Sequence, residues 1–227
     1  ELGKRIRNGF IAGKTDNKRN KLCAFDYSQI ELRVAAMMSG DKNLTKIFRE
    51  KKDAHTGVAS FVFGVPMDKV DSEMRRVAKV INFGILYGMG STSLAASTGL
   101  SRDEARAFIE KYFVVYKNLA EYVEQTKALV RSMGYVETLF GRRRYLPEIN
   151  SGMPQVRAAA ERMATNHPVQ GTAADIMKLA MIKIHEQLQV TGYKLQVAML
   201  LQVHDELVFE VAKDAVREVA AIVRETM

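Results

Sequence analysis

The sequence is poor in cysteine and has no long apolar run, and each shortage excludes a class of protein. The single cysteine, Cys23, rules out an internal disulfide framework and favours a reducing compartment. It lies in the apolar run 22–25, so we expect a small buried side chain rather than a nucleophile. No signal peptide is visible and no apolar stretch approaches the length of a membrane span, which predicts a soluble intracellular protein without a membrane partner.

The chain otherwise has the composition of a globular protein with a basic surface. Its 227 residues are 47% hydrophobic, enough for one large domain or for two subdomains that interrupt each other. The formal net charge of +8 favours polyanionic partners. Charge alone fits a merely basic surface equally well.

Strand-like patterns occur at both ends of the sequence, and helix-like patterns fill the middle. Helices are predicted over residues 29–40, 43–63, 72–88, 116–133, 153–188 (with a bend or an interruption at Pro168) and 214–227, and a capping box at Ser101 and Glu104 begins another. Buried strands are predicted at 22–25, 196–202 and 207–211, and a basic-tipped hairpin at 135–146. The simplest arrangement is an α+β fold in which both ends of the chain form one antiparallel sheet and a mostly helical subdomain is inserted.

Two acids stand where the strand patterns end. Asp26 follows the first strand, and Asp205 lies in the turn between the last two. An unpaired carboxylate among apolar residues is costly, so we expect a cation partner. If the strands are neighbours the acids converge, and their oxygens, with waters and substrate phosphates, suit magnesium. The alternative for each acid taken alone is a turn cap or an ion pair with a nearby arginine.

A helical face over residues 75–87 has a cationic end and an aromatic end. Arg75, Lys79, Phe83 and Tyr87 recur every four residues, so they lie within about 120° of arc along about 18 Å of helix axis. A nucleoside triphosphate has the same polarity, because its phosphates suit arginine and lysine and its base suits aromatic rings. The alternative is a surface helix with solvated cations and aromatic side chains in the core. His55, just upstream, is either a further phosphate donor or a structural histidine.

Three motifs in order resemble those of the family A DNA polymerases, the bacterial DNA polymerase I type. They are residues 26–33, 75–88 and 203–206, and residues 141–147 and 170–175 also resemble family segments. The resemblance covers nearly the whole chain. It implies a palm sheet formed from both ends and inserted helical fingers, with residues 1–47 as the N-terminal palm, 48–152 as the fingers and 153–227 as the C-terminal palm.

The resemblance also implies an activity. It is template-directed DNA synthesis, in which deoxynucleotides pass from dNTPs to a primer 3′-hydroxyl in the 5′-to-3′ direction by a two-metal mechanism. Two Mg²⁺ ions are the implied cofactors, with Mn²⁺ as a substitute. The implied partners are primer–template DNA and dNTPs, for a monomer at the nucleoid in the cytoplasm that serves DNA replication or repair.

Individual residues receive roles from the same resemblance. The metal ligands are Asp26, Asp205 and the Tyr27 carbonyl, and Glu206 lies beside them near the primer end. Glu31 is a steric gate against a ribose 2′-hydroxyl, and Lys79 is a proton donor to pyrophosphate, which makes the catalytic set Asp26, Asp205, Lys79 and Glu206. The residues expected to hold the nucleotide are Arg75, Lys79, Phe83, Tyr87, His55, Glu31 and Gln29. Those expected to contact primer and template are Arg33, Arg162, Asn166, Gln170, Gln202 and His204.

The ends of the chain depart from the family pattern. The thumb, any exonuclease domain and a last strand beyond Met227 are missing, so we expect palm and fingers alone. One rival function is therefore a truncated fragment that binds DNA or nucleotide with little autonomous catalysis. A second rival is a metal nuclease that uses the same two acids. The helical face over residues 75–87 argues against it, because hydrolysis does not need a binding surface as long as a nucleoside triphosphate.

Overall fold

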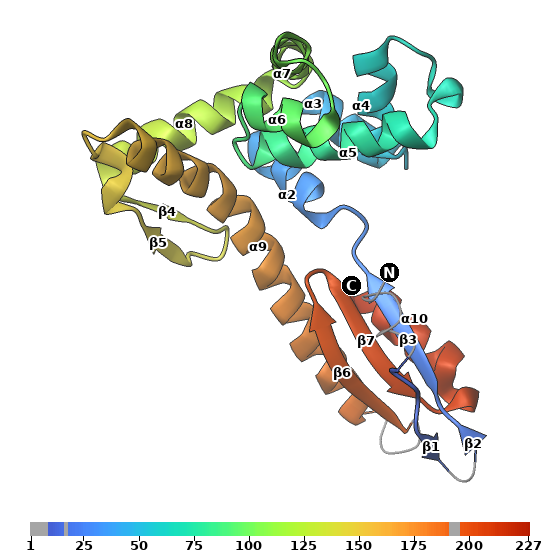
Figure 1. Cartoon of the computed structure of the whole chain (residues 1–227). Helices are drawn as coiled ribbons and strands as arrows, with labels where there is room; N and C mark the ends of the chain where they lie inside the picture. Colours follow the sequence, from blue (N-terminus) through green and yellow to red (C-terminus); the bar gives the residue numbers. More distant parts are fainter. Residues whose placement is uncertain (1–8, 16–17, 191–195) are drawn as a thin grey trace. The chain divides into compact units, whose positions relative to one another are not determined.

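A computed structural model of the protein describes residues 9–15, 18–190 and 196–227 (Figure 1). Contacts divide the chain into two compact units, one of Glu1–Ile30 with Ala173–Met227 and the other of Glu31–Thr172. The second unit is inserted into the first, as the predicted architecture requires. Within the described ranges, no helix combines the length and the apolarity that crossing a membrane requires.

The first unit is built on a three-stranded antiparallel sheet with the strand order β3–β7–β6 (Figure 1). β3 is Lys21–Asp26, β6 is Val197–Val203 and β7 is Glu206–Val211. Strands from both ends of the chain pair with each other, which confirms the predicted sheet and the α+β class. Before β3 lies a two-stranded ribbon of β1 (Lys14–Thr15) and β2 (Lys18–Arg19).

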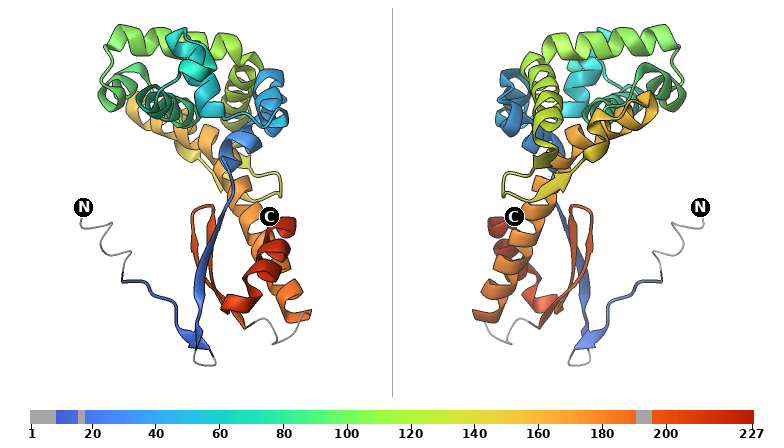
Figure 2. Two further views of the ribbon diagram at one scale, coloured as in Figure 1. Left: turned by 90° about the vertical axis from the view of Figure 1, so that its right-hand side faces the viewer. Right: turned by 90° about the vertical axis from the view of Figure 1, so that its left-hand side faces the viewer.

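Helices cover one face of this sheet. The C-terminal part of α9 (Pro154–Val190) and α10 (Val216–Thr226) lie on the same side of the strands (Figure 2). Their apolar side chains meet those of β7 in a buried cluster of Met177, Ile184, Leu207, Phe209, Val211, Ala215, Val219 and Val223. Phe25 of β3 joins this cluster edge-on to Phe209, with ring centroids 5.7 Å apart. Burial of these side chains is the main force that holds the unit together.

The other face of the sheet is more open than the sequence predicted. Residues 196–202 were expected to form a buried strand, and that prediction is wrong for β6, in which Leu200, Leu201 and Val203 are exposed. β6 lies at the edge of the sheet, and α9 and α10 pack on the opposite face, so an apolar run does not guarantee burial here. The pairing of β6 with β7 also shifts register between Met199 and Leu201.

The second unit is mostly helical. Its first helices are α2 (Ile30–Ser39), α3 (Lys42–Arg49), α4 (Ala54–Phe63), α5 (Ser72–Leu86), α6 (Ser91–Thr98), α7 (Arg102–Val115) and α8 (Lys117–Met133). A hairpin of β4 (Tyr135–Glu137) and β5 (Arg143–Tyr145) and the N-terminal part of α9 follow. Short 3₁₀ turns occur at Met67–Lys69, Pro147–Asn150 and, in the first unit, Lys213–Ala215.

Most of the predicted helices are confirmed, and the single helix predicted over residues 43–63 is wrong. Residues 43–63 form two helices rather than one, because Asp53 caps α4 by accepting a hydrogen bond from the Thr56 N–H at 2.7 Å. The predicted helix 153–188 is present as α9, and of the two alternatives at Pro168 an interruption is wrong, because the helix continues through that residue. The Ser101–Glu104 capping box and the hairpin are present as predicted.

A buried carboxylate joins two helices of this unit. Asp41 is 2% exposed, and its Oδ1 accepts from the Leu44 N–H at 3.0 Å, which caps α3. Its Oδ2 accepts from the N–H groups of Asn118 and Leu119, at 3.2 and 3.4 Å, at the start of α8. One side chain thus satisfies the free amide groups of two helix N-termini.

The β4–β5 hairpin is fixed to α9 at a glycine. Arg142 donates to the Gly171 carbonyl at 2.9 Å, and the Leu139 N–H donates to Thr172 Oγ1 at 3.0 Å. A Cβ atom at position 171 would lie 2.5 Å from the Cγ2 methyl of Thr138, which is closer than real contacts allow. The hairpin therefore approaches the helix at a distance that glycine permits.

Candidate active site

The predicted metal-binding acids lie at one end of the β3–β7–β6 sheet. Asp26, the last residue of β3, is the cross-strand partner of Glu206, the first residue of β7. Asp205 comes just before Glu206 in the β6–β7 turn, and its carbonyl accepts a hydrogen bond from the Tyr27 N–H at 3.1 Å. Strand register thus brings three carboxylates from distant parts of the sequence to neighbouring backbone positions.

Asp26 and Glu206 belong to the face of the sheet opposite the core. Their chain neighbours Phe25 and Leu207 pack in the core cluster, and side chains alternate between faces along a strand. Asp26 is exposed and Glu206 is half-buried. The expectation that Asp26 follows a fully buried strand is therefore wrong, because every second residue of β3 faces away from the helices.

The oxygens of these acids are of the kind that bind a divalent cation whose remaining ligands come from elsewhere. Like charges directly opposite each other destabilise a sheet, and a cation between them offsets the repulsion. Carboxylate and carbonyl oxygens are the donors that hard divalent ions prefer. Within the described ranges, no group of three or more histidine, cysteine, aspartate or glutamate side chains is placed to hold a metal ion.

Two residues beside the acids have a left-handed backbone conformation. His204 has φ 55° and Gln29 has φ 57°. A two-residue hairpin turn usually places glycine at such a position, and a non-glycine residue held in a sparsely populated conformation costs about 1–3 kcal/mol. Gln202 Nε2 donates to the His204 carbonyl at 3.1 Å and supports the turn. Backbone strain at both positions marks this end of the sheet as a candidate site.

In the helical unit, α5 carries the face predicted for a nucleotide. Arg75 and Lys79 are exposed, and Phe83 and Tyr87 are half-buried. The rings of Phe83 and Tyr87 stack with centroids 5.9 Å apart. The apolar side of the helix is buried and consists of Val77, Ala78, Ile81, Ile85 and Leu86. The cations and the aromatic rings therefore share one accessible side of the helix.

Arg75 is held by an acid that the sequence analysis did not single out. Its Nε and Nη2 donate to Asp53 Oδ1 and Oδ2, at 3.2 and 2.8 Å. Burial raises the pKa of Asp53, but the hydrogen bonds from Arg75 and Thr56 outweigh it and hold that pKa well below its usual range. A two-point contact of this kind fixes the plane of a guanidinium group.

His55 lies between Asp53 and the aromatic end of this face. The residue is 2% exposed, the centroid of its ring is 5.6 Å from that of the Phe83 ring, and its Nδ1 is 3.0 Å from Asn82 Nδ2. Burial lowers the pKa of His55 to about 4; the charge of Asp53 opposes this shift, and the charges of Arg75 and Lys79 add to it. His55 is therefore neutral at physiological pH.

Glu31 and Arg33 lie in the first turns of α2. Glu31 is half-buried and accepts a hydrogen bond from the Tyr87 hydroxyl, so it is held beside the aromatic end of the α5 face. The Arg33 guanidinium is 4.6 Å from the centroid of the Phe48 ring. The structure thus places the predicted gate residue in contact with a predicted nucleotide-binding residue.

The predicted DNA contacts on α9 share one side of that helix. Arg162, Asn166 and Gln170 are spaced by four residues, so they follow one another along the same face. Arg162 and Gln170 are exposed and Asn166 is half-buried. Gln202 and His204 are exposed in the first unit. The predicted site residues are thus divided between the two units.

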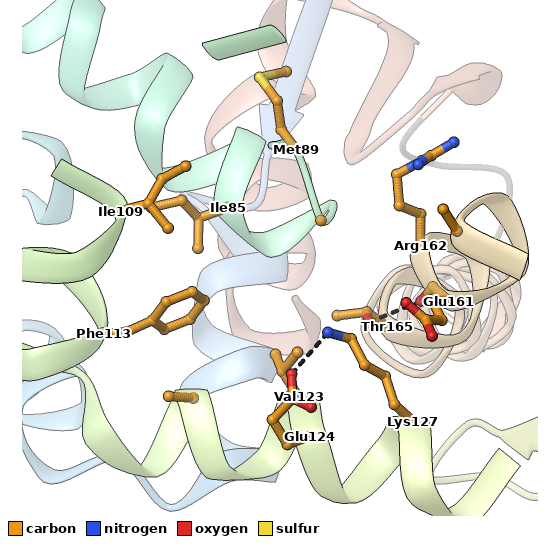
Figure 3. A pocket seen from close by; sticks show the side chains of 13 residues that line it. Ile85, Met89, Ile109, Phe113, Val123, Glu124, Lys127, Glu161, Arg162 and Thr165 are labelled. Carbon is orange, nitrogen blue, oxygen red and sulfur yellow. Dashed lines mark hydrogen bonds and ion pairs between the residues drawn. The ribbon is translucent and has the colours of Figure 1, made fainter. Parts of the chain in front are cut away.

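A cavity of about 390 Å³ lies between α5, α7, α8 and α9 within the helical unit (Figure 3). Ile85, Ile109 and Phe113 lie on one side of it, and Lys127 and Arg162 on the other (Figure 3). Gly88, which has φ 68°, contributes to its wall; a Cβ there would lie 3.0 Å from Arg162 Cγ. The cavity and the α9 face therefore share Arg162.

The structure reveals two polar residues that the sequence analysis missed. Asp53 stands three residues before Thr56, which is the spacing of a helix cap, and it could have been found once residues 43–63 were divided into two helices. Asn82 is a fully buried amide on the apolar side of α5, and a polar residue at such a position requires a partner. The identity of that partner, His55, is visible only in three dimensions.

Known proteins resemble this chain over its whole length. The thermostable DNA polymerase I of Thermus aquaticus is 52% identical over 226 residues, which are 100% of this chain and 26% of that protein. DNA polymerase I of Pseudomonas aeruginosa is 49% identical over 225 residues, which are 99% of this chain and 24% of that protein. The chain thus spans about a quarter of the length of these relatives.

A solved structure has the same fold. The POL domain of Pol1 from M. smegmatis, in complex with DNA primer–template and dNTP, superposes with a TM-score of 0.92 and is 42% identical. This chain is covered completely, and it corresponds to 39% of that one. Residues 1–227 also match the family model described as DNA polymerase family A, and the chain belongs to that family.

Proposed function

We propose that this chain contains the palm and fingers of a DNA-directed DNA polymerase. In this proposal deoxynucleotides pass from dNTPs to the 3′-hydroxyl of a primer, in the order set by a template strand, in the 5′-to-3′ direction. The observation that carries the proposal is the accessible face of α5, whose cations and stacked rings match the polarity of a nucleoside triphosphate. A nuclease that used the same acids would not need this face.

In this proposal, residues of the chain bind the metal ions and hold the incoming nucleotide. Asp26, Asp205 and the Tyr27 carbonyl bind two Mg²⁺ ions, which Mn²⁺ can replace, and Glu206 lies beside them near the primer end. When bound, such ions lower the pKa of a hydroxyl nucleophile and neutralise charge on the leaving oxygen. Arg75, His55 and Lys79 hold the triphosphate, Lys79 gives a proton to pyrophosphate, and Phe83, Tyr87 and Gln29 contact the sugar and base.

The proposal also includes residues that contact DNA, a division into palm and fingers, and a cellular location. Arg33, Arg162, Asn166, Gln170, Gln202 and His204 face primer and template. Residues 1–47 and 153–227 form the palm and residues 48–152 the fingers, although contacts group 31–47 and 153–172 with the helical unit. The protein acts as a monomer on primer–template DNA in the cytoplasm, at the nucleoid, in replication or repair.

Primer extension by this chain, with magnesium and all four dNTPs, tests the proposal directly. The proposal predicts template-dependent addition of nucleotides. A second candidate is a protein that binds DNA or nucleotide with little catalysis of its own. The second candidate is supported if this chain binds DNA or dNTP but does not extend the primer. In that case, joining a relative's remaining segments to the chain should produce primer extension.

We expect Glu31→Ala to relax the exclusion of ribonucleotides. If the Glu31 side chain occupies the place of a ribose 2′-hydroxyl, its removal lowers the preference for deoxynucleotides by about 10- to 100-fold, which is the usual effect of a steric contact. The measurement is kcat/KM for dNTP and rNTP on the same primer–template. Glu31→Gln is the matched control, because it keeps the size of the side chain and should retain most of the preference. Equal preference in Glu31→Ala and the unaltered protein contradicts the gate.

We expect Asp53→Asn to raise the KM for dNTP by about 5- to 10-fold with little change in kcat, equivalent to about 1 kcal/mol of lost positioning. Asp53 uses two of the five N–H groups of Arg75, and the other three remain for phosphate oxygens. Asparagine still caps α4, so the variant removes the charge and keeps the helix start. An unchanged KM shows that Asp53 does not position Arg75 for the nucleotide.

The same ion pair predicts a pH dependence of stability. Because the pKa of Asp53 is depressed in the folded state, its contribution is complete above the unfolded pKa of about 4 and is lost as the pH falls below it. The difference in Tm between the unaltered chain and Asp53→Asn should therefore shrink between pH 7 and pH 3. A difference that grows at low pH would contradict the assignment.

A further inference from the structure

Asn82 is a buried amide that contacts the side chain of His55. It has no exposed surface and lies on the side of α5 that packs inside the helical unit. Its Nδ2 is 3.0 Å from His55 Nδ1, and within the described residues its Oδ1 has no hydrogen-bond partner. A buried amide at an otherwise apolar position is costly, so its contact with His55 needs an explanation beyond packing.

The chemistry of this contact determines where the imidazole proton lies. In the orientation that the Asn82 amide has here, its NH₂ group faces Nδ1 of His55; because a carboxamide NH₂ can only donate, Nδ1 accepts. A neutral imidazole that accepts at Nδ1 carries its proton on Nε2, and an imidazolium ion cannot accept at either nitrogen. Within the described residues, no hydrogen bond to Nε2 of His55 is recorded, so this N–H remains available to a ligand.

We propose that Asn82 is a positioning residue that keeps His55 neutral with its proton on Nε2, so that His55 offers an uncharged N–H donor to a triphosphate oxygen. The identity of the acceptor rests on the proposed function, whereas the state of the imidazole does not. Asn82 acts through His55 and does not touch the nucleotide itself. The role resembles that of the outer groups that fix the tautomer of a functional histidine in other sites.

The surroundings of His55 agree with this assignment. The charged groups that face it are Asp53, Arg75 and Lys79, and the Phe83 ring covers one side. Asp53 would favour a protonated ring, but its oxygens are already engaged by Arg75 and Thr56. Burial and the two cations favour the neutral ring. His55 therefore adds no charge to this end of the α5 face across the physiological pH range.

The state of the ring can be measured on this chain without any activity. The chain has 4 histidines, and after labelling with ¹⁵N-histidine the signals of His55 are assigned by their loss in His55→Gln. The proposal predicts the Nε2–H tautomer from pH 8 down to about pH 5, well below the midpoint of a free histidine. An Nδ1–H tautomer at pH 7, or a His55 titration midpoint near that of free histidine, overturns the proposal.

Two variants of Asn82 complete the test. In Asn82→Asp the carboxylate can only accept, so His55 should move its proton to Nδ1 and its titration midpoint should rise by about 1–3 pH units. Asn82→Leu has a similar size and no polar atom, so His55 should populate both tautomers. An Nε2–H tautomer that is unchanged in both folded variants overturns the role of Asn82.

A binding measurement separates this inference from the proposed function. If His55 donates to the triphosphate, the ratio of the dNTP affinities of Asn82→Asp and the unaltered chain should vary between pH 6 and pH 8, because the ionisation of the phosphate itself is common to both proteins. If the NMR result is as predicted and His55→Gln binds dNTP unchanged, the triphosphate role of His55 fails while the tautomer assignment stands.

Discussion

Primer extension should fall by at least about 1,000-fold in Asp205→Asn and in Asp26→Asn relative to the unaltered protein. A metal ion supplies several kcal/mol of transition-state stabilisation, and each 1.36 kcal/mol corresponds to a factor of ten in rate. Asparagine has the size of aspartate, so the sheet register that pairs Asp26 with Glu206 should be unaffected. The measurement is the rate of single-nucleotide addition at saturating dNTP.

Glu210→Gln is the matched control for these two variants. Glu210 pairs with Leu22 in the same two strands, on the same face of the sheet as Asp26 and Glu206, but farther from the turn. Its Oε1 accepts from the Gly13 N–H and from Asn20, and glutamine keeps an acceptor oxygen there. We expect Glu210→Gln to retain nearly full extension. Full activity in Asp205→Asn would show that Asp205 does not bind the metal.

Gly171→Ala should destabilise the protein by about 1–3 kcal/mol, the usual cost of overpacking. In an ordinary helix the same change stabilises by about 1 kcal/mol, because alanine has the higher helix propensity. Here the new Cβ would lie 2.5 Å from Thr138 Cγ2, so either α9 or the hairpin must move. The movement would also disturb the bond from Arg142 to the Gly171 carbonyl. The midpoint of urea unfolding reports the loss.

A second substitution distinguishes a steric cause from a general intolerance. Thr138→Ser removes the obstructing methyl and keeps the hydroxyl, which accepts from the N–H groups of Phe140 and Arg142. The double variant should therefore recover most of the lost stability. Gly57→Ala in α4 is the helical control, because the nearest atom to its Cβ would be a side-chain methyl of Ile47 at 3.4 Å. If Gly57→Ala and Gly171→Ala behave alike, the close approach is not the cause.

Sequence patterns predicted the fold better than they predicted burial. The apolar runs at both ends identified the strands of the sheet, and the four-residue spacing placed Arg75, Lys79, Phe83 and Tyr87 on one side of α5. Whether a strand lies at an edge depends on pairing with distant residues, which explains why β6 was wrongly expected to be buried. A local pattern contains no information about which face a helix covers.

The polar contacts of the site were the least predictable part. Asp53 and Arg75 are 22 residues apart, and Asn82 and His55 are 27 apart, so no periodicity links them. The resemblance to known polymerases pointed to Arg75 and His55, but it did not identify the residues that hold them. Such supporting contacts depend on how two helices pack, and packing is decided by the whole unit rather than by either segment.

Asp41 has a consequence for how the helical unit unfolds. Its carboxylate stabilises the first turns of α3 and α8, which begin about 75 residues apart in sequence. If either helix start frays, the buried Asp41 carboxylate loses hydrogen-bond donors. Opening one helix start therefore also makes the environment of the carboxylate at the other start less favourable. We therefore expect the starts of α3 and α8 to open together as one cooperative segment, and to resist local unfolding more than either helix start would alone.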